Sequence, residues 1–322
     1  MLFEDNFDFF DANKWQYQLY DGWQYGVGDW GTGELTFYRN SSNNVYINDG
    51  QLILNARVES DPSVLWNECW DECRIRCTNM GYAPGSQELQ WCIDPCGWPR
   101  CDQVRTRGIS SGRIRTFNHF SVAPSDGPNK VRIEARIKLP PGGFAGAWPA
   151  LWTLPAEGAT DNCSGCSYRG PWPNGGELDI LETANTFDSI LGTIHYGGDG
   201  QDVYKSFRYN VTTPPPPDGY HVVAVEWSTT SIEWFMDGQL YGTAVPKSAT
   251  TDGWWTTAGG GLGAPFDGKF YLILNLAVGG WFTGGEYARV NNGAQLDLMT
   301  IQNQLGMAGK AMAVDWVRVC GQ

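Results

Sequence analysis

Short segments in which apolar and polar residues alternate recur along the whole chain, and they restrict its fold more than any other feature. In "KVRIEARIKL", Val131, Ile133, Ala135, Ile137 and Leu139 face one way, while the charged residues between them face the other. This pattern predicts a strand with one buried face. The segments "GQLILNARVE", "HVVAVEWS", "KFYLILNLAV" and "MAVDWVRV" are similar, and "MDGQ" (236–239) predicts a hairpin turn. Together they predict an all-β fold of two antiparallel sheets stacked as a sandwich.

The composition fits that fold class. The 322 residues include 41 Gly, 18 Pro and 16 Trp, and only 18% are charged, which is typical of many strands and turns. We find no internal repeat and no linker that would divide the chain. We therefore expect a single catalytic domain over 1–322, with a Cys-rich loop inserted at about 66–103, between a strand ending near Glu59 and another beginning near Gly108.

The charge of the chain restricts its partners. A net charge of −13 disfavours nucleic acid or an anionic membrane, because a protein that binds phosphates needs an exposed basic surface. No apolar stretch reaches the roughly 18 residues that span a bilayer. A neutral or cationic ligand fits better.

Six of the nine cysteines crowd into the inserted segment, as Cys69, Cys73, Cys77, Cys92, Cys96 and Cys101. Their spacing differs from that of common zinc modules. We favour three disulfides over metal binding or free thiols, because a segment so poor in aliphatic residues needs covalent links to keep a shape. The connectivity is left open.

The remaining cysteines and three sequons bear on the location of the protein. Cys163 and Cys166 could close a small loop, which would leave Cys320 unpaired or bonded elsewhere. Disulfides indicate an extracellular, secreted protein. Asn40, Asn162 and Asn210 each begin an N-x-S/T sequon, a glycan acceptor only in a eukaryotic secretory pathway.

The segment "GGELDILETAN" (175–185) places Glu177, Asp179 and Glu182 in an otherwise apolar run. Burying this much negative charge is unfavourable unless something uses it. In a regular strand Glu177 and Asp179 share a face and Glu182 points to the opposite one. A β-bulge between Asp179 and Glu182 would bring all three onto one face, and such bulges are often found beside active sites.

Two carboxyl groups about 5 to 5.5 Å apart can hydrolyse a glycosidic bond with retention, one as nucleophile and one as acid and then base. The shorter Asp179 could hydrogen-bond the nucleophile. An ionised Glu177 would raise the pKa of Glu182 and keep it protonated. The alternative is a calcium site or a solvated strand face. Calcium, however, prefers carboxylates mixed with carbonyls on loops.

Aromatic residues near the acids favour a sugar ligand. Trp148 and Trp152 lie four residues apart, and Trp172 precedes Glu177 by five residues; flat indole rings stack on the apolar faces of sugars. His195 should lie on the strand after the acids, within reach of Glu182 or Asp179 if the two strands pair as a hairpin. A histidine that simply packs in the core is the alternative.

The chain resembles glycoside hydrolase family 16, and within it the laminarinases, which are endo-β-1,3-glucanases. "GELDILE" matches the E-x-D-x-x-E motif of that family in its bulged form. Other motifs occur along the chain in the family's order: "SGRIRT" and "GAWPALWTLP" before it, and "GTIHYGG", "IEWFMDG" and "NLAVGGWF" after it. The resemblance implies a β-jelly-roll sandwich with a cleft across its concave sheet. It implies Glu177 as nucleophile, Glu182 as acid/base and Asp179 as their assistant. The Cys-rich segment departs from the family.

The same resemblance implies further site residues. Trp148, Trp152 and Trp172 would line sugar subsites with His195 beside the scissile bond. Tyr38, Arg39 and Asn44 would contact the sugar at the glycone side, and Trp281 would add a further contact. A structural calcium ion would be held at Glu4, Gly50 and Asp315. No cofactor is expected for catalysis.

These features predict a retaining endo-hydrolase of β-1,3-glucan that acts as a monomer on a polysaccharide. A β-glucan-binding protein on the same fold is the alternative from another class, although such proteins typically lose the catalytic glutamates. Mixed-linkage glucan or an algal galactan is the alternative substrate, since relatives share the acids and differ in their cleft loops.

Overall fold

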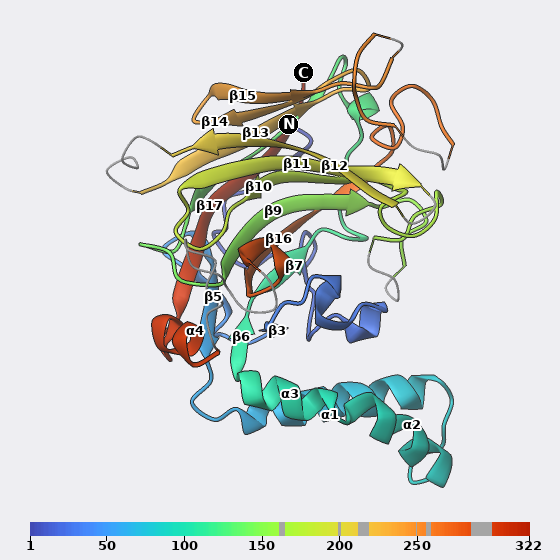
Figure 1. The fold of residues 1–322 in the computed structure, drawn as a ribbon, viewed down its shortest axis with the longest axis vertical. Helices are drawn as coiled ribbons and strands as arrows, with labels where there is room; N and C mark the ends of the chain where they lie inside the picture. Colours follow the sequence, from blue (N-terminus) through green and yellow to red (C-terminus); the bar gives the residue numbers. More distant parts are fainter. Residues whose placement is uncertain (161–164, 199–200, 212–218, 249, 256–258, 285–297) are drawn as a thin grey trace.

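Two sheets built mainly of antiparallel strands stack on each other (Figure 1). The computed structural model describes the chain except for residues 161–164, 199–200, 212–218, 249, 256–258 and 285–297. The two stacked sheets confirm the expected all-β sandwich. Within the described residues no helix has both the length and the hydropathy needed to cross a membrane.

The larger sheet has ten strands in the order β15-β14-β13-β8-β17-β5-β6-β3, with β1 paired to β17 and β4 to β5. Only the pairing of β3 with β6 is parallel among the strand pairs described. In chain order the strands are β1 (Phe3–Asp5), β3 (Phe37–Tyr38), β4 (Val45–Asn48), β5 (Gln51–Val58), β6 (Ile109–Ser111), β8 (Val131–Lys138), β13 (His221–Trp227), β14 (Ile232–Met236), β15 (Gln239–Ala244) and β17 (Lys310–Gly321).

Two local predictions in this sheet are confirmed. Buried and half-buried residues alternate along β8, as its sequence indicates. Strands β14 and β15 form the expected hairpin. Asp237 and Gly238 in its turn have φ of 50° and 79°, a backbone geometry that Asp-Gly adopts readily.

The smaller sheet has seven strands in the order β12-β11-β10-β9-β16-β7-β2, and several of them form long curved ribbons (Figure 1). In chain order they are β2 (Gln16–Tyr17), β7 (Arg113–Arg115), β9 (Ala147–Pro155), β10 (Glu177–Glu182), β11 (Ser189–Gly198), β12 (Gln201–Asn210) and β16 (Phe270–Val278). Strand β10, which carries the acid cluster, lies in the middle of this sheet.

The main core lies between the two sheets. It includes Ile133 of β8 and Val317 of β17 from one sheet, and Leu178 of β10 and Leu274 of β16 from the other. Burial of these side chains stabilises each sheet against the other. Short helices connect the strands: η1 (Trp23–Tyr25), η2 (Gly28–Gly31), η3 (Pro124–Asp126), η4 (Trp281–Thr283) and α4 (Leu298–Leu305).

The Cys-rich segment, expected as an inserted loop at about 66–103, lies between β5 and β6 and is helical. It forms α1 (Ser63–Asn79), α2 (Gln87–Gly97) and α3 (Arg100–Arg107), which project below the sheets in Figure 1. The spacing of its cysteines was a helical signal, since residues four apart share one face of a helix. Cys69, Cys73 and Cys77 in α1 lie at that spacing.

The three disulfides predicted for the segment are confirmed. Cys69 bonds Cys101, Cys73 bonds Cys96, and Cys77 bonds Cys92. The bonds are nested, because each successive cysteine of α1 pairs with one that lies closer to it in the chain.

The other cysteines are only partly described. Cys166 is disulfide-bonded, whereas Cys163 lies outside the described residues. Cys320 carries a free thiol. Of the three sequon asparagines, Asn40 and Asn210 are exposed and Asn162 lies outside the described residues.

We expect Gly192→Ala to destabilise the fold by about 1–3 kcal/mol. A Cβ atom at Gly192 would lie 2.1 Å from Cδ1 of Trp234, a fully buried side chain whose Nε1 donates to the carbonyl of Asp179. Urea unfolding of both proteins measures the difference. Gly261→Ala is the control, because nothing lies within 4 Å of that Cβ position; equal midpoints for the two variants would contradict the prediction.

Candidate active site

A bulge in β10 brings the three acids onto one face of the sheet. In the pairing with β11, Asp179 lies opposite Thr193 and Glu182 opposite Leu191, so three steps along β10 match two along its neighbour. The pairing with β9 shifts at the same place. The bulge predicted from the parity of the sequence is thus confirmed. Ile180 and Leu181 both point into the core as a result.

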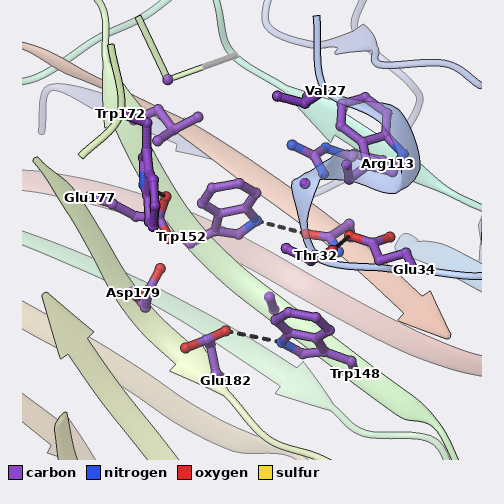
Figure 2. Close-up of a pocket in the computed structure, with 16 residues that line it drawn as sticks. Val27, Thr32, Glu34, Arg113, Trp148, Trp152, Trp172, Glu177, Asp179 and Glu182 are labelled. Carbon is purple, nitrogen blue, oxygen red and sulfur yellow. Dashed lines mark hydrogen bonds between the residues drawn. The ribbon is translucent and has the colours of Figure 1, made fainter. Parts of the chain in front are cut away.

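Glu177, Asp179 and Glu182 all line one cavity, together with Trp148, Trp152 and Trp172. Figure 2 shows the acids along β10 with the three tryptophans close to them. The structure therefore brings together the acids and tryptophans that the sequence singles out. An indole wall beside carboxylates can receive a sugar ring and a glycosidic oxygen at once.

Two tryptophans hold the two glutamates in separate hydrogen bonds. Nε1 of Trp172 donates to Oε2 of Glu177 at 2.9 Å, and Nε1 of Trp148 donates to Oε1 of Glu182 at 3.0 Å (Figure 2 shows the second). Each bond stabilises the ionised carboxylate and so lowers its pKa. Each glutamate consequently has a fixed orientation.

Burial opposes ionisation of all three acids. It is the largest cause of the raised pKa of Glu177, of Glu182 and of Asp179. The charge of Glu177 adds to the effect on Glu182, whose pKa is raised to about 7, and the charges of both glutamates add to that on Asp179, whose pKa lies well above its usual range. Asp179 is therefore neutral at mildly acidic pH, while one glutamate can be charged and the other protonated.

His195 lies on β11 directly opposite Glu177. Its Nε2 lies 3.6 Å from Oδ2 of Asp179, so the predicted reach to the acids is confirmed. Its Nδ1 lies 3.1 Å from Oδ1 of Asp202. Burial disfavours the charged ring, but the hydrogen bond to Asp202 and the negative charge of Glu177 outweigh it and raise the pKa of His195 to about 9.

The protonated His195 also bears on metal binding. The ligating atoms of Glu177, Asp179 and His195 lie within 4.8 Å of one another, which is close enough for a metal ion. A charged imidazole has no lone pair to donate, however. In its protonated form His195 is therefore a hydrogen-bond donor rather than a ligand.

The opposite wall of the cavity comes from residues that the sequence analysis did not single out. It contains Val27, Trp30, Thr32, Glu34 and Arg113. Figure 2 shows Val27, Thr32, Glu34 and Arg113 across from the acids. The guanidinium of Arg113 lies 4.0 Å from the ring centroid of Trp30 and 4.9 Å from that of Trp152. The signal available in the sequence was the presence of Arg113 inside "SGRIRT", one of the motifs that carry the resemblance.

Asn275 and Asp202 were also missed. Asn275 of β16 lines the cavity and accepts a hydrogen bond from Nε1 of Trp152 at 2.7 Å. It is a polar residue in the run "FYLILNLAV", and that interruption could have marked it. The pairing of Asp202 with His195 depends on the register of β11 with β12, which the sequence does not reveal.

Three predicted sugar contacts lie outside the cavity wall. Tyr38 is fully buried and its hydroxyl donates to Oε2 of Glu34. Arg39 pairs with Glu59 and Glu68. Buried Asn44 donates to the carbonyl of Asn55 and to Ser110. Their side chains support the structure behind the wall.

Trp281 is 72% exposed. It lies at the rim, where a Cβ atom at Gly33 would come within 3.2 Å of its Nε1. The structure thus places it beside the cavity wall rather than among the residues that line the cavity.

Comparisons with known proteins bear on the whole chain. Residues 129–257 match the profile of the family described as Glycosyl hydrolases family 16. The chain is 31% identical over 301 residues to Glucan endo-1,3-beta-glucosidase A1 of Niallia circulans, which matches 89% of this chain but only 35% of that longer protein. It is 28% identical to a Beta-1,3-glucan-binding protein of Penaeus monodon, with 99% of this chain and 89% of that protein covered.

A solved structure agrees in fold. The endo-beta-1,3-glucanase from Pyrococcus furiosus aligns with a TM-score of 0.62 and 26% identity, over 98% of this chain and 92% of that one. The jelly-roll arrangement expected from the sequence is confirmed by this likeness.

The residues expected to hold calcium do not fit a metal ion as the structure places them. Oε1 of Glu4 accepts from Nε of Arg318 at 2.8 Å, and Oδ2 of Asp315 accepts from Nη1 of Arg136 at 2.5 Å. Gly50 lies in the turn between β4 and β5. Because an arginine already neutralises each carboxylate, neither offers the free negative charge that attracts calcium.

We expect excess chelator to leave the melting temperature unchanged, because arginines rather than a metal neutralise Glu4 and Asp315. Differential scanning calorimetry with and without EDTA measures this, and added calcium after EDTA treatment is the control. A drop in melting temperature that calcium restores would contradict the prediction.

Proposed function

We propose that this chain, which belongs to glycosyl hydrolase family 16, hydrolyses internal bonds of β-1,3-glucan with retention of configuration. The observation that carries the proposal is the bulge at Ile180, which brings Glu177 and Glu182 into one tryptophan-lined cavity. The linkage is supported by the relatives, since two of the proteins described above are named as glucanases of 1,3-linked β-glucan.

In the first step a carboxylate oxygen of Glu177 attacks the anomeric carbon while Glu182 gives its proton to the leaving oxygen. The glycosidic bond breaks, and an ester joins the sugar to Glu177. A pKa of about 7 suits Glu182 to this role, because it stays protonated at mildly acidic pH and can still release the proton.

In the second step Glu182, now ionised, takes a proton from water as the water attacks the anomeric carbon. The ester bond breaks, Glu177 leaves as a carboxylate, and the sugar keeps its β configuration. Neutral Asp179 can donate a hydrogen bond within this cluster, and protonated His195 offsets the charge of the carboxylates.

We further propose that the protein acts outside the cell as a monomeric, single catalytic domain on this polysaccharide. The three nested disulfides support this location, since such bonds persist in oxidising compartments.

A glucan-binding protein without activity is the second candidate, favoured by the likeness to the protein from Penaeus monodon. The retained Glu177 and Glu182 argue against it, since binding alone would not require two half-buried glutamates held by tryptophans. The products formed from each polymer distinguish activity on mixed-linkage glucan or galactan from activity on β-1,3-glucan.

We expect the wild type to release reducing ends from laminarin and Glu177→Gln to lose at least about 10³-fold of that rate, because the nucleophile is absent. Azide separates the two roles. With an activated aryl glycoside, Glu177→Ala should yield the α-glycosyl azide by a single displacement, and Glu182→Ala the β-azide by two. Binding of laminarin by a wild type that releases no reducing ends would instead support the second candidate.

We also expect a bell-shaped pH profile of kcat/KM. Substitution of Trp148 should shift its alkaline limb, and substitution of Trp172 its acidic limb. Activity falls below the pKa of Glu177, which must be charged, and above that of Glu182, which must be protonated, near pH 7. Trp148→Phe removes a bond that lowers the pKa of Glu182, so the alkaline limb should move up by about 0.5–1 unit. Trp172→Phe should raise the acidic limb instead.

The two tryptophan variants control for each other, because both keep an aromatic ring in the cavity. A shift of the same limb in both variants, or of neither, would contradict the assigned roles.

A further inference from the structure

We infer that the disulfide-linked helices α1–α3 fix the far wall of the cavity, and that Arg107 is a positioning residue for substrate binding. The wall segment, residues 21–34, is called the cleft loop below. This inference rests on the proposed function only in naming β-1,3-glucan as the ligand.

The cleft loop has a strained point in its backbone. Asp29 and Trp30 have φ of 48° and 56°, so two consecutive residues other than glycine adopt the left-handed conformation. Each costs about 1–2 kcal/mol in this conformation. Backbone hydrogen bonds within the loop offset part of that cost. Contacts from outside the loop that add to them help to keep Trp30, Gly31 and Thr32 in the cavity wall.

Arg107 of α3 supplies one such contact at the strained position itself. Its Nη1 and Nη2 donate to Oδ1 and Oδ2 of Asp29 at 2.5 and 3.0 Å, and Nη1 also reaches the carbonyl of Glu34 at 3.4 Å. A planar guanidinium bound to both oxygens of a carboxylate fixes direction as well as distance. One side chain thereby joins the middle of the cleft loop to its end.

A second contact holds the start of the loop. Nε and Nη2 of Arg100 donate to both oxygens of Asp21 at 2.7 and 2.9 Å. Nη1 of Arg76 donates to the carbonyl of Trp23, and its guanidinium lies 4.3 Å from the centre of that ring. Arginines of the helices therefore bond to the cleft loop at both ends and at its strained centre.

The helices can serve as a rigid support because they are fixed among themselves. The Cys69–Cys101 bond links α1 to α3, and the other two bonds link α1 to α2. Buried Glu72 pairs with Arg100, and that guanidinium also contacts the sulfurs of Cys73 and Cys96. The arginine that holds Asp21 is thus anchored to the disulfide-linked interior.

The reacting centre has separate support. Glu177 and Glu182 are held by the sheet and by Trp172 and Trp148. Loosening the cleft loop should therefore weaken sugar binding and leave the chemical step nearly intact, a division that appears as a higher KM at similar kcat.

The test compares Arg107→Ala with Arg105→Ala, which removes the same charge from the same helix. Arg105 is half exposed and pairs with Asp102 instead of the cleft loop. We expect Arg107→Ala to raise the KM for laminarin about tenfold with kcat within about twofold, and Arg105→Ala to change neither. Asp29→Asn should reproduce the effect, and the double variant with Arg107→Ala should add little to it.

A second measurement does not depend on activity. Hydrogen exchange at the amides of Trp30, Thr32, Gly33 and Glu34, which bond to backbone carbonyls at Asp21 and Asp29, should speed up in Arg107→Ala and stay unchanged in Arg105→Ala. Unchanged exchange or an unchanged KM in Arg107→Ala would overturn the inference. If the wild type neither binds nor cleaves laminarin, the proposed function fails, and the exchange result alone decides the role of Arg107 in the loop.

Discussion

The extra residue in β10 is the constraint on which the rest of the site depends. Ile180 and Leu181 are consecutive, yet both pack in the core, so the chain returns to the cavity at Glu182. Trp234, reaching from the other sheet, donates to the carbonyl of Asp179, and Thr153 donates to that of Leu178. These bonds satisfy backbone groups at the irregular point. A regular strand would instead bury the Glu182 carboxyl in the core, at a cost of several kcal/mol without a partner.

Three carboxyl groups in one cavity repel one another when they are ionised. The surrounding residues reduce this repulsion because they favour a different protonation state for each group. Burial and mutual charge keep Asp179 neutral, while His195, held by Asp202, stays positive. The positive imidazole then offsets the negative charge of Glu177 while Glu182 is still protonated, which is the state that a proton donor needs before the bond breaks.

The sequence specified what depends on local pattern. Strand alternation in β8, the Asp-Gly hairpin and the parity argument for the bulge all follow from residues a few positions apart, and all are confirmed. The helices of the Cys-rich segment were missed because its cysteines were taken as a sign of an irregular loop, although their four-residue spacing is helical. Tyr38, Arg39 and Asn44 were expected in the cavity, but tertiary packing buries or pairs them. Arg113 contacts Trp30 and Trp152, which are distant from it in sequence, and only the fold brings them together. The contact of Asp202 with His195 depends instead on the register of β11 with β12.

The two walls of the cavity are stabilised in different ways, and this bears on how such a site can change. The acid wall is part of a sheet whose other face is the core, so a substitution there affects both folding and chemistry. The cleft loop is strained and held by arginines from a covalently linked helical segment outside the sheets. A change in that segment can reshape the binding wall while Glu177 and Glu182 keep their positions.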